Sequence, residues 1–230
     1  MSGSPPTLAT VLMTLIGVTW RRLFRGRALW VCALIAALPM VLAVAVKGRH
    51  NVMGVIDLSA FLVMTILPPV FVASSIGEEI EDRTTTYLWS RPLPRWTVIV
   101  AKLLALAPVA MVLVAGGWFL AFQIGKDTSP PLQSTIAMAA GAFAIATMSA
   151  GIATLVPRHG MALAIVYIVI VDMAIGIIPA SLQNISITRQ VRLLAGLEQP
   201  SAIAQPAITM AIIAGLWLTI GLLRIRKLES

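Results

Sequence analysis

The chain has 230 residues, of which 59% are hydrophobic and only 11% are charged, and its formal net charge is +8. A soluble domain is usually about a quarter charged. This chain therefore lacks the polar surface to cover itself in water, which predicts an integral membrane protein. Its basic residues cluster at the ends of apolar runs, a placement that favours lipid headgroups over nucleic acid. The single cysteine, Cys32, excludes a disulfide within one chain.

Residues 7–26 predict an amphipathic helix that lies on the cytosolic leaflet of the membrane. Trp20 is placed at its flank, where an indole favours the headgroup region. One side of this helix carries Leu8, Val11, Leu12, Leu15, Ile16 and Leu23, and the other carries Thr10, Thr14, Arg21 and Arg25. The alternative is the first half of a long spanning helix, but four arginines between residues 21 and 27 oppose it.

The remaining sequence predicts one all-α transmembrane domain over residues 1–230, because six apolar runs each approach the roughly 20 residues that cross a bilayer. In the second run, Pro68 and Pro69 are expected to kink the helix. In the fourth, Ala142, Ala146 and Ala150 form a ridge of small residues that lets another helix approach closely. The six predicted spans cover about 28–46, 52–76, 97–124, 135–156, 161–179 and 206–223.

The distribution of basic residues predicts the orientation. Six crossings place both termini on the same side of the membrane. That side holds twelve of the 17 Lys and Arg residues, while the opposite side holds only Lys47, Arg49, Lys126, Arg189 and Arg192. Because basic residues are enriched in cytoplasmic segments, we expect both termini and the segment between the second and third spans to be cytosolic.

The obvious enzyme candidate is the run from Glu78 to Arg83, which matches the E-E-x-x-x-R pattern of intramembrane CAAX-type proteases. Those enzymes also need histidines in the patterns F-x-x-x-H and H-x-x-x-N/D, and neither His50 nor His159 fits them. No nucleotide-binding loop is present, since Gly125-Lys126 is followed by Asp127. We therefore expect no catalytic motif, metal or cofactor in this chain.

Two carboxylates lie within apolar runs. Asp172 is placed near the middle of the fifth span and Asp57 near the outer end of the second. An intramembrane acid can relay protons or pair with a cationic substrate, so an orphan proton-coupled carrier that uses Asp172 is one alternative function. The other interpretation is a protonated or hydrogen-bonded structural residue inside the bundle. It fits Asp172 as well as the functional interpretation does, and it fits Asp57 better.

Residues 77–102 are the most informative stretch, because they place eight of the 26 charged residues between two apolar spans. Such a segment must face water or a protein partner. Arg91 precedes Pro92, so a helix over 83–90 should end there. The expected result is a short cytosolic helix with the aromatic tip Tyr87-Leu88-Trp89, suited to docking into a groove on another protein. A short interfacial helix without a partner is the alternative.

The run from Glu81 to Trp96, continuing to Lys102, resembles the signature between the second and third spans of ABC-2 type transporter permeases. That pattern reads roughly E-x-E-x-G-T-x-E-x-L-L-x-x-P-x-x-R, followed by a hydrophobic run that carries a lysine. Arg83 stands where the family usually has glycine, and Thr86 stands where an acid is common. The six-span plan, the N-terminal helix and the outer segment before the last span are similar as well.

This resemblance implies the membrane-spanning half of an ATP-driven exporter in the cell membrane. A separate cytosolic ATPase, in two copies, would carry ATP and Mg²⁺, and a second permease chain, identical or not, would complete the transporter. Residues 77–90 would act as the coupling helix seated in a cleft of the ATPase. The residues implied in this coupling are Glu79, Glu81, Asp82, Arg83, Thr84, Tyr87, Leu88, Trp89, Arg91 and Arg95.

Overall fold

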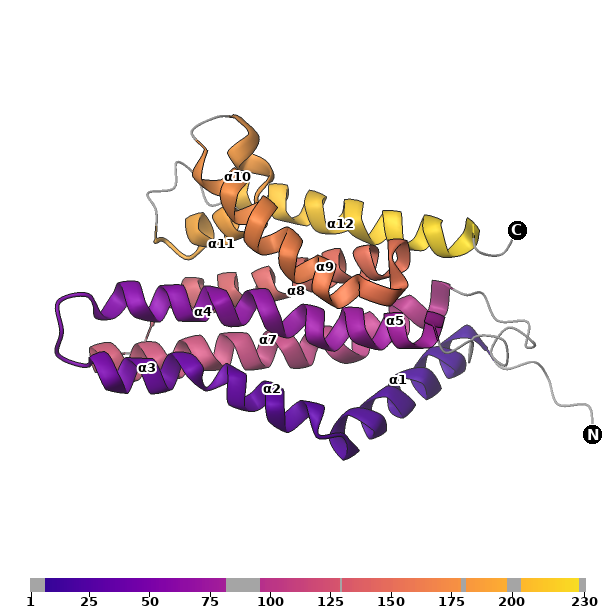
Figure 1. Cartoon of the computed structure of the whole chain (residues 1–230), viewed down its shortest axis with the longest axis horizontal. Helices are drawn as coiled ribbons and strands as arrows, with labels where there is room; N and C mark the ends of the chain where they lie inside the picture. Colours follow the sequence, from indigo (N-terminus) through magenta and orange to yellow (C-terminus); the bar gives the residue numbers. More distant parts are fainter. Residues whose placement is uncertain (1–6, 82–95, 129, 179–180, 198–203, 228–230) are drawn as a thin grey trace, which may run out of the picture.

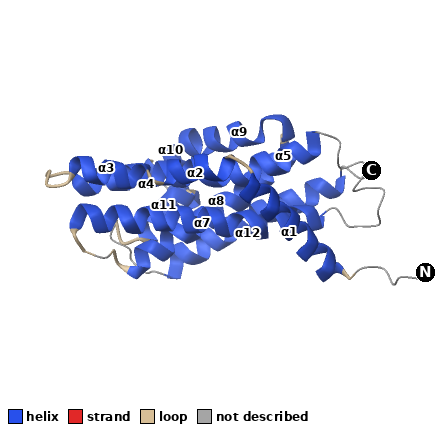
Figure 2. Cartoon of the chain, turned by 90° about the horizontal axis from the view of Figure 1, so that it is seen from below, coloured by secondary structure: helices blue, strands red, loops and turns tan. Residues whose placement is uncertain are grey.

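A computed structural model describes residues 7–81, 96–128, 130–178, 181–197 and 204–227 (Figure 1). These residues form helices and turns with no strand among them (Figure 2). In chain order the helical elements are α1 (Leu8–Arg25), α2 (Ala28–Ala36), α3 (Leu38–Val46), α4 (Val52–Pro68), η1 (Pro69–Ala73), α5 (Ser74–Glu81), α7 (Trp96–Lys126), α8 (Leu132–Leu155), η2 (Pro157–His159), α9 (Gly160–Val166), η3 (Tyr167–Asp172), α10 (Met173–Ile177), η4 (Ser181–Ile185), α11 (Ile187–Leu194) and α12 (Ala204–Lys227).

Within the described residues, six helical stretches are long and apolar enough to cross a membrane, as the sequence predicts. They are Ala28–Val46, Val52–Ile80, Trp96–Lys126, Leu132–Leu155, Pro157–Ile177 and Ala204–Ile225. The second stretch ends at Ile80 rather than near residue 76. The first is not one continuous helix, because α2 and α3 are separated at Ala37. Pro39 lies directly after this break and has no N–H to donate to the preceding turn.

The second span stays helical through its two prolines. Pro68 ends α4, and Pro69 begins the π-helical turn η1, after which α5 continues. Two missing N–H groups loosen the hydrogen-bond ladder here, and wider i to i+5 turns accommodate that loss. The hydroxyl of Ser74 donates to the carbonyl of Val70, and Thr65 Oγ1 donates to the carbonyl of Phe61 at 2.8 Å. The irregularity predicted at the prolines therefore takes the form of a π turn.

Helix α8 forms the centre of the bundle and packs against α4, α7, α9, α11 and α12. The three alanines of the predicted ridge, Ala142, Ala146 and Ala150, are all buried in this core. Next to them Gly151 faces α12, and a Cβ atom at this position would lie 2.8 Å from the carbonyl oxygen of Trp217. Small side chains on α8 therefore allow the neighbouring helices to approach closely.

The bundle has two ends, which are named here by their helices. The α5 end holds the end of α5, the start of α7, η2 and the end of α12, whereas the α11 end holds α11 and the turns after α3 and α7 (Figure 1). Helix α1 runs obliquely to the bundle near the α5 end, and Figure 2 shows the same divergence from below. Trp20 Nε1 donates to the carbonyl of Ala105 in α7 at 2.9 Å, which fixes α1 against that helix.

A pair of adjacent glycines in α7 provides a test of this packing. A Cβ atom on Gly117 would lie 2.6 Å from the carbonyl oxygen of Ala36, whereas one on Gly116 would meet nothing within 4 Å. We expect Gly117→Ala to destabilise the fold by about 1–3 kcal/mol, the usual cost of overpacking. Gly116→Ala is the matched control and should be neutral or slightly stabilising, because alanine favours a helix. Unfolding in mixed micelles measures both, and equal effects would contradict the close contact of α7 with the α2–α3 break.

Candidate functional site

Much of the predicted coupling segment lies outside the described residues. Among its residues, Glu79 is described in full and Glu81 is the last residue of α5. The others fall within 82–95 and are not described: Asp82, Arg83, Thr84, Tyr87, Leu88, Trp89, Arg91 and Arg95. The structure therefore describes the two helices that flank this segment, α5 and α7.

A buried ion pair joins these two helices. Lys102 Nζ of α7 lies 2.8 Å from Glu79 Oε1 of α5, and the lysine side chain is only 4% exposed. The same ammonium group donates to the carbonyl of Ser75. Glu79 Oε2 is buried and has no hydrogen-bond partner among the described residues. Because a buried lysine is costly unless it is paired, this contact fixes the start of α7 to the end of α5.

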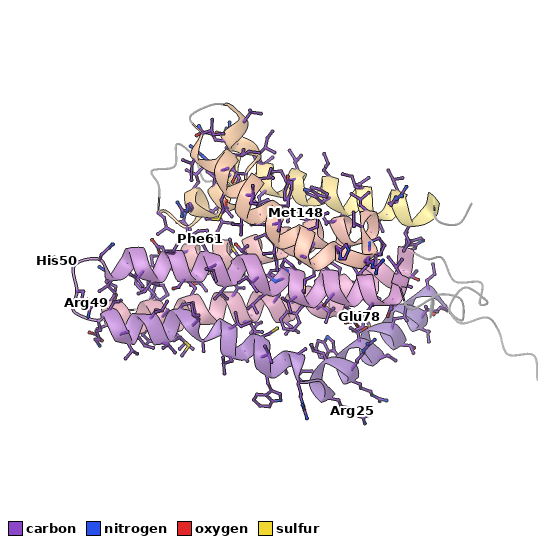
Figure 3. The ribbon with its side chains drawn as sticks, in the orientation of Figure 1. Arg25, Arg49, His50, Phe61, Glu78 and Met148 are labelled. Carbon is purple, nitrogen blue, oxygen red and sulfur yellow. The ribbon has the colours of Figure 1, made fainter. Side chains whose placement is uncertain are left out.

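A second ion pair connects α5 with the N-terminal helix. Arg22 Nη2 of α1 lies 3.1 Å from Glu78 Oε2, and the two side chains are 71% and 54% exposed. Figure 3 shows Glu78 on the side of α5 that faces α1. Exposed pairs of this kind contribute little to stability, about 1 kcal/mol or less. The contact therefore positions α1 next to the end of α5 without contributing much to the stability of the fold.

The end of α5 also packs closely against the turn between the fourth and fifth spans. A Cβ atom on Gly77 would lie 2.6 Å from the carbonyl oxygen of Pro157 in η2, a distance that real Cβ atoms do not reach. Only glycine permits this approach. We call Arg22, Gly77, Glu78, Glu79 and Lys102 the α5-end cluster. It connects α5 with α1, α7 and η2.

Of this cluster, sequence reasoning selected only Glu79 as a site residue. Glu78 was considered only in the rejected protease pattern, and Arg22, Gly77 and Lys102 were not selected. A signal for Lys102 was present, because a lysine six residues inside an apolar helix must find a partner. Its partner is Glu79, 23 positions earlier in the chain and across the segment that the structure does not describe. For Arg22 and Gly77 the partners depend on the tertiary arrangement, and no local pattern reveals them.

Asp172 lies in the second half of the span Pro157–Ile177, five residues before Ile177. The chain returns through η4 so that the N-terminus of α11 meets its carboxylate. Oδ1 accepts from Ile187 N at 2.7 Å, while Oδ2 accepts from Thr188 N at 3.0 Å, from Thr188 Oγ1 at 2.6 Å and from Ser186 Oγ at 3.2 Å. Asp172 thus caps α11, and its negative charge suits a helix N-terminus.

Asp57 lies in the second turn of α4, at the α11 end. Together with Arg192 of α11 it lines a cavity of about 370 Å³. The guanidinium carbon of Arg192 lies 4.9 Å from the ring centroid of Phe61, within the range of a cation–π contact. The Oδ1 atom of Asp57 is buried and has no hydrogen-bond partner among the described residues. This environment differs from that of Asp172, whose carboxylate is fully engaged.

The two histidines lie at opposite ends of the bundle. His50 is in the turn after α3, far from Glu78 in Figure 3, whereas His159 ends η2 at the α5 end. The two histidines therefore cannot join one site together, and His50 lies too far away to join the carboxylates of α5. Within the described ranges, no group of three His, Cys, Asp or Glu side chains is arranged to hold a metal ion.

No model of a known protein family matches this chain, and no curated protein matches it either. The resemblance to ABC-2 permeases therefore rests on the residues from Glu81 to Lys102 and on the six-span plan. The geometry of the α5-end cluster is an independent observation, since it depends on contacts of the described residues alone.

Proposed function

We propose that this chain is the membrane-spanning permease subunit of an ATP-driven ABC-2 type exporter, and that a separate ATPase acts on it through residues 77–95. The chain forms the substrate pathway and supplies no catalytic residue of its own. Two copies of a cytosolic ATPase carry ATP and Mg²⁺, and a second permease chain, identical or different, completes the transporter. The protein lies in the cell membrane with both termini in the cytosol.

The observation that carries this proposal is the α5-end cluster. The segment 82–95 begins where α5 ends and finishes where α7 begins, and the Glu79–Lys102 pair holds these two helices together. Through Arg22 and Gly77, α5 also contacts α1 and η2. A partner that displaces this segment would therefore move several helices together rather than one loop. That is the mechanical property that a coupling segment needs.

The exposed apolar surface supports a membrane location and leaves room for a second chain. Three of the six candidate spans have only 22% of their apolar window buried within this chain, namely Ala28–Val46, Pro157–Ile177 and Ala204–Ile225. Large apolar side chains on α1 are exposed as well, for example Met13 at 73% and Phe24 at 59%. Lipid, and a partner permease over part of this surface, would cover them. The exposed face of α1 suits the interfacial position that its sequence predicts.

The contacts of Asp172 weaken the alternative of a proton-coupled carrier. A proton-relay carboxylate must exchange its proton with a pathway, whereas this carboxylate accepts four hydrogen bonds from buried residues of one helix cap. Those donors hold the carboxylate in one position, as the cap of α11. In an exporter, Asp172 does not take part in the transport step. Its role is to hold α11 in place.

Affinity purification tests whether the protein is an ABC permease. The tagged chain is cross-linked in its native membrane while ATP is trapped, and is then purified in mild detergent. We expect a P-loop ATPase in near-stoichiometric amount. A purification that yields the chain without any such ATPase, under conditions that preserve other membrane complexes, would refute the proposal.

The coupling role predicts a specific uncoupled variant. Our hypothesis is that Tyr87 and Trp89 anchor the ATPase, because buried aromatic side chains dominate protein interfaces. Replacing both with alanine should lower the affinity for the ATPase by at least about tenfold, the equivalent of about 1.4 kcal/mol. Stimulation of ATP hydrolysis in reconstituted vesicles measures this effect. Trp30→Ala, which removes a 74% exposed aromatic side chain of α2, is the matched control. Unchanged stimulation in the double variant would contradict coupling through this tip.

A further inference from the structure

The cavity at the α11 end has walls of mixed chemistry. Gly54, Asp57 and Leu58 of α4 line it, together with Arg192 of α11 and Leu197, which follows that helix. It therefore presents a carboxylate, a guanidinium and two leucine side chains to one space of about 370 Å³. A cavity of this size holds several water molecules or a small polar headgroup.

Asp57 gives this cavity a specific acceptor. Its Oδ1 atom is buried and has no hydrogen-bond partner among the described residues, although buried carboxylate oxygens are normally satisfied. Arg192 lines the same cavity, so a positive charge lies near this carboxylate. A group that donates N–H bonds and carries a positive charge would complement a carboxylate in the cavity wall best, and a primary ammonium has both properties.

The basic residues of α11 add an anion-attracting region beside this acceptor. Arg192 also lines a smaller neighbouring cavity of about 40 Å³, together with Arg189 and Phe61. Arg189 Nη1 donates to Gln183 Oε1, while its Nε is buried without an acceptor among the described residues. The lining of the larger cavity thus includes one basic and one acidic side chain, the pair of charges that a zwitterion complements.

The depth of the cavity matches a lipid interface. Asp57 is five residues after the start of α4, which corresponds to about 7.5 Å along a helix of 1.5 Å rise per residue. In a bilayer with an apolar core of about 30 Å and a total thickness of about 40–45 Å, this is the boundary between headgroups and acyl chains. Leu58 is 61% exposed at the same level and offers an apolar surface next to the charged residues.

We propose that this cavity binds the headgroup of a zwitterionic amphiphile, whose primary ammonium donates to the carboxylate of Asp57 while its anionic group faces the charge of Arg192. The exposed side chain of Leu58 contacts the apolar part of the ligand. The site is independent of the exporter proposal, because it depends only on the contacts of α4 and α11.

Native mass spectrometry of the purified full-length protein tests this site with dihexanoyl-phosphatidylethanolamine as the probe. Binding to the wild type should be at least about tenfold tighter than to Asp57→Asn, since a hydrogen bond between charged groups is lost. Dihexanoyl-phosphatidylglycerol lacks the amine and should not distinguish the two proteins. Asp127→Asn, the same change in an exposed residue at the same end, should bind like the wild type.

Two further comparisons separate the possible outcomes. Asp57→Glu keeps the charge and should retain the preference for the amine headgroup, which shows that loss of binding in Asp57→Asn is not a folding defect. Displacement of the lipid by O-phosphoethanolamine would support the site and identify a water-soluble ligand as able to fill it. If the lipid binds and O-phosphoethanolamine does not displace it, the site is supported and its ligand must carry acyl chains as well as the headgroup. Equal binding of phosphatidylethanolamine to the wild type and to Asp57→Asn would overturn the proposal.

Discussion

Replacing Lys102 with methionine is expected to destabilise the fold by about 3 kcal/mol, near the lower end of the range for breaking a buried ion pair. The change leaves Glu79 without its cation, and Glu79 Oε2 already lacks a partner among the described residues. The lower end applies because the Glu79 side chain remains 24% exposed and can recover some hydration. Unfolding with sodium dodecyl sulfate in mixed micelles measures this loss.

A double variant distinguishes the ion pair from simple packing. Lys102→Met combined with Glu79→Gln removes both charges, so it should recover a substantial part of the stability lost in the single variant. Lys126→Met, at the exposed end of the same helix, should change stability by no more than about 0.5 kcal/mol. If the double variant is no more stable than Lys102→Met alone, the pair does not join α5 to α7 as described here.

The same pair bears on the proposed function. If residues 82–95 transmit movement to the bundle, they do so through the helix ends that Glu79 and Lys102 hold together. The double variant should recover much of the stability but lacks the ionic link, so we expect it to bind the ATPase while transporting poorly. Variants of Tyr87 and Trp89 should instead lose the ATPase itself. These two defects are measurable separately in reconstituted vesicles.

Asp172→Ala is the second change with a large expected effect, a destabilisation of about 3 kcal/mol. It leaves the N–H groups of Ile187 and Thr188 and the hydroxyls of Ser186 and Thr188 without their acceptor in a buried environment. Each unsatisfied buried donor costs about 1–3 kcal/mol, and local rearrangement recovers part of the total. Because α11 packs on α8 and α12, release of its N-terminus should also increase proteolysis within residues 181–197.

The isosteric variant Asp172→Asn separates the structural role from a proton-relay role. Asparagine keeps one carbonyl oxygen but loses the charge and brings an amide donor toward Thr188, so its stability should lie between the wild type and Asp172→Ala. Asp127→Asn, which removes a carboxylate from an exposed ion pair with Lys47 at the same end and keeps a side chain that tolerates its positive φ, serves as the control. A variant Asp172→Asn that is as stable as the wild type yet abolishes proton-driven flux would favour the carrier function instead.

The sequence by itself determined the class of this protein and the number of its candidate spans. A chain with 59% hydrophobic residues and only 11% charged residues must bury its surface in lipid, and the length of each apolar run matches a bilayer crossing. These are local properties, because any helix of sufficient length and hydropathy can cross a bilayer, whichever helices pack beside it. The interfacial position of α1 and the coupling helix over 83–90 stay predictions, the second because it lies outside the described residues.

Only the tertiary structure decided which polar residues act together. Asp172 and Asp57 look alike in the sequence as single carboxylates in apolar runs. The return of the chain through η4 gives Asp172 four donors, whereas Asp57 Oδ1 has no donor among the described residues. Likewise Lys102 finds Glu79 across 23 positions of sequence. Pairing of buried charges depends on which helix ends meet in space. Hydropathy and residue spacing along one helix do not reveal which helix ends come together. The packing of the whole bundle determines that.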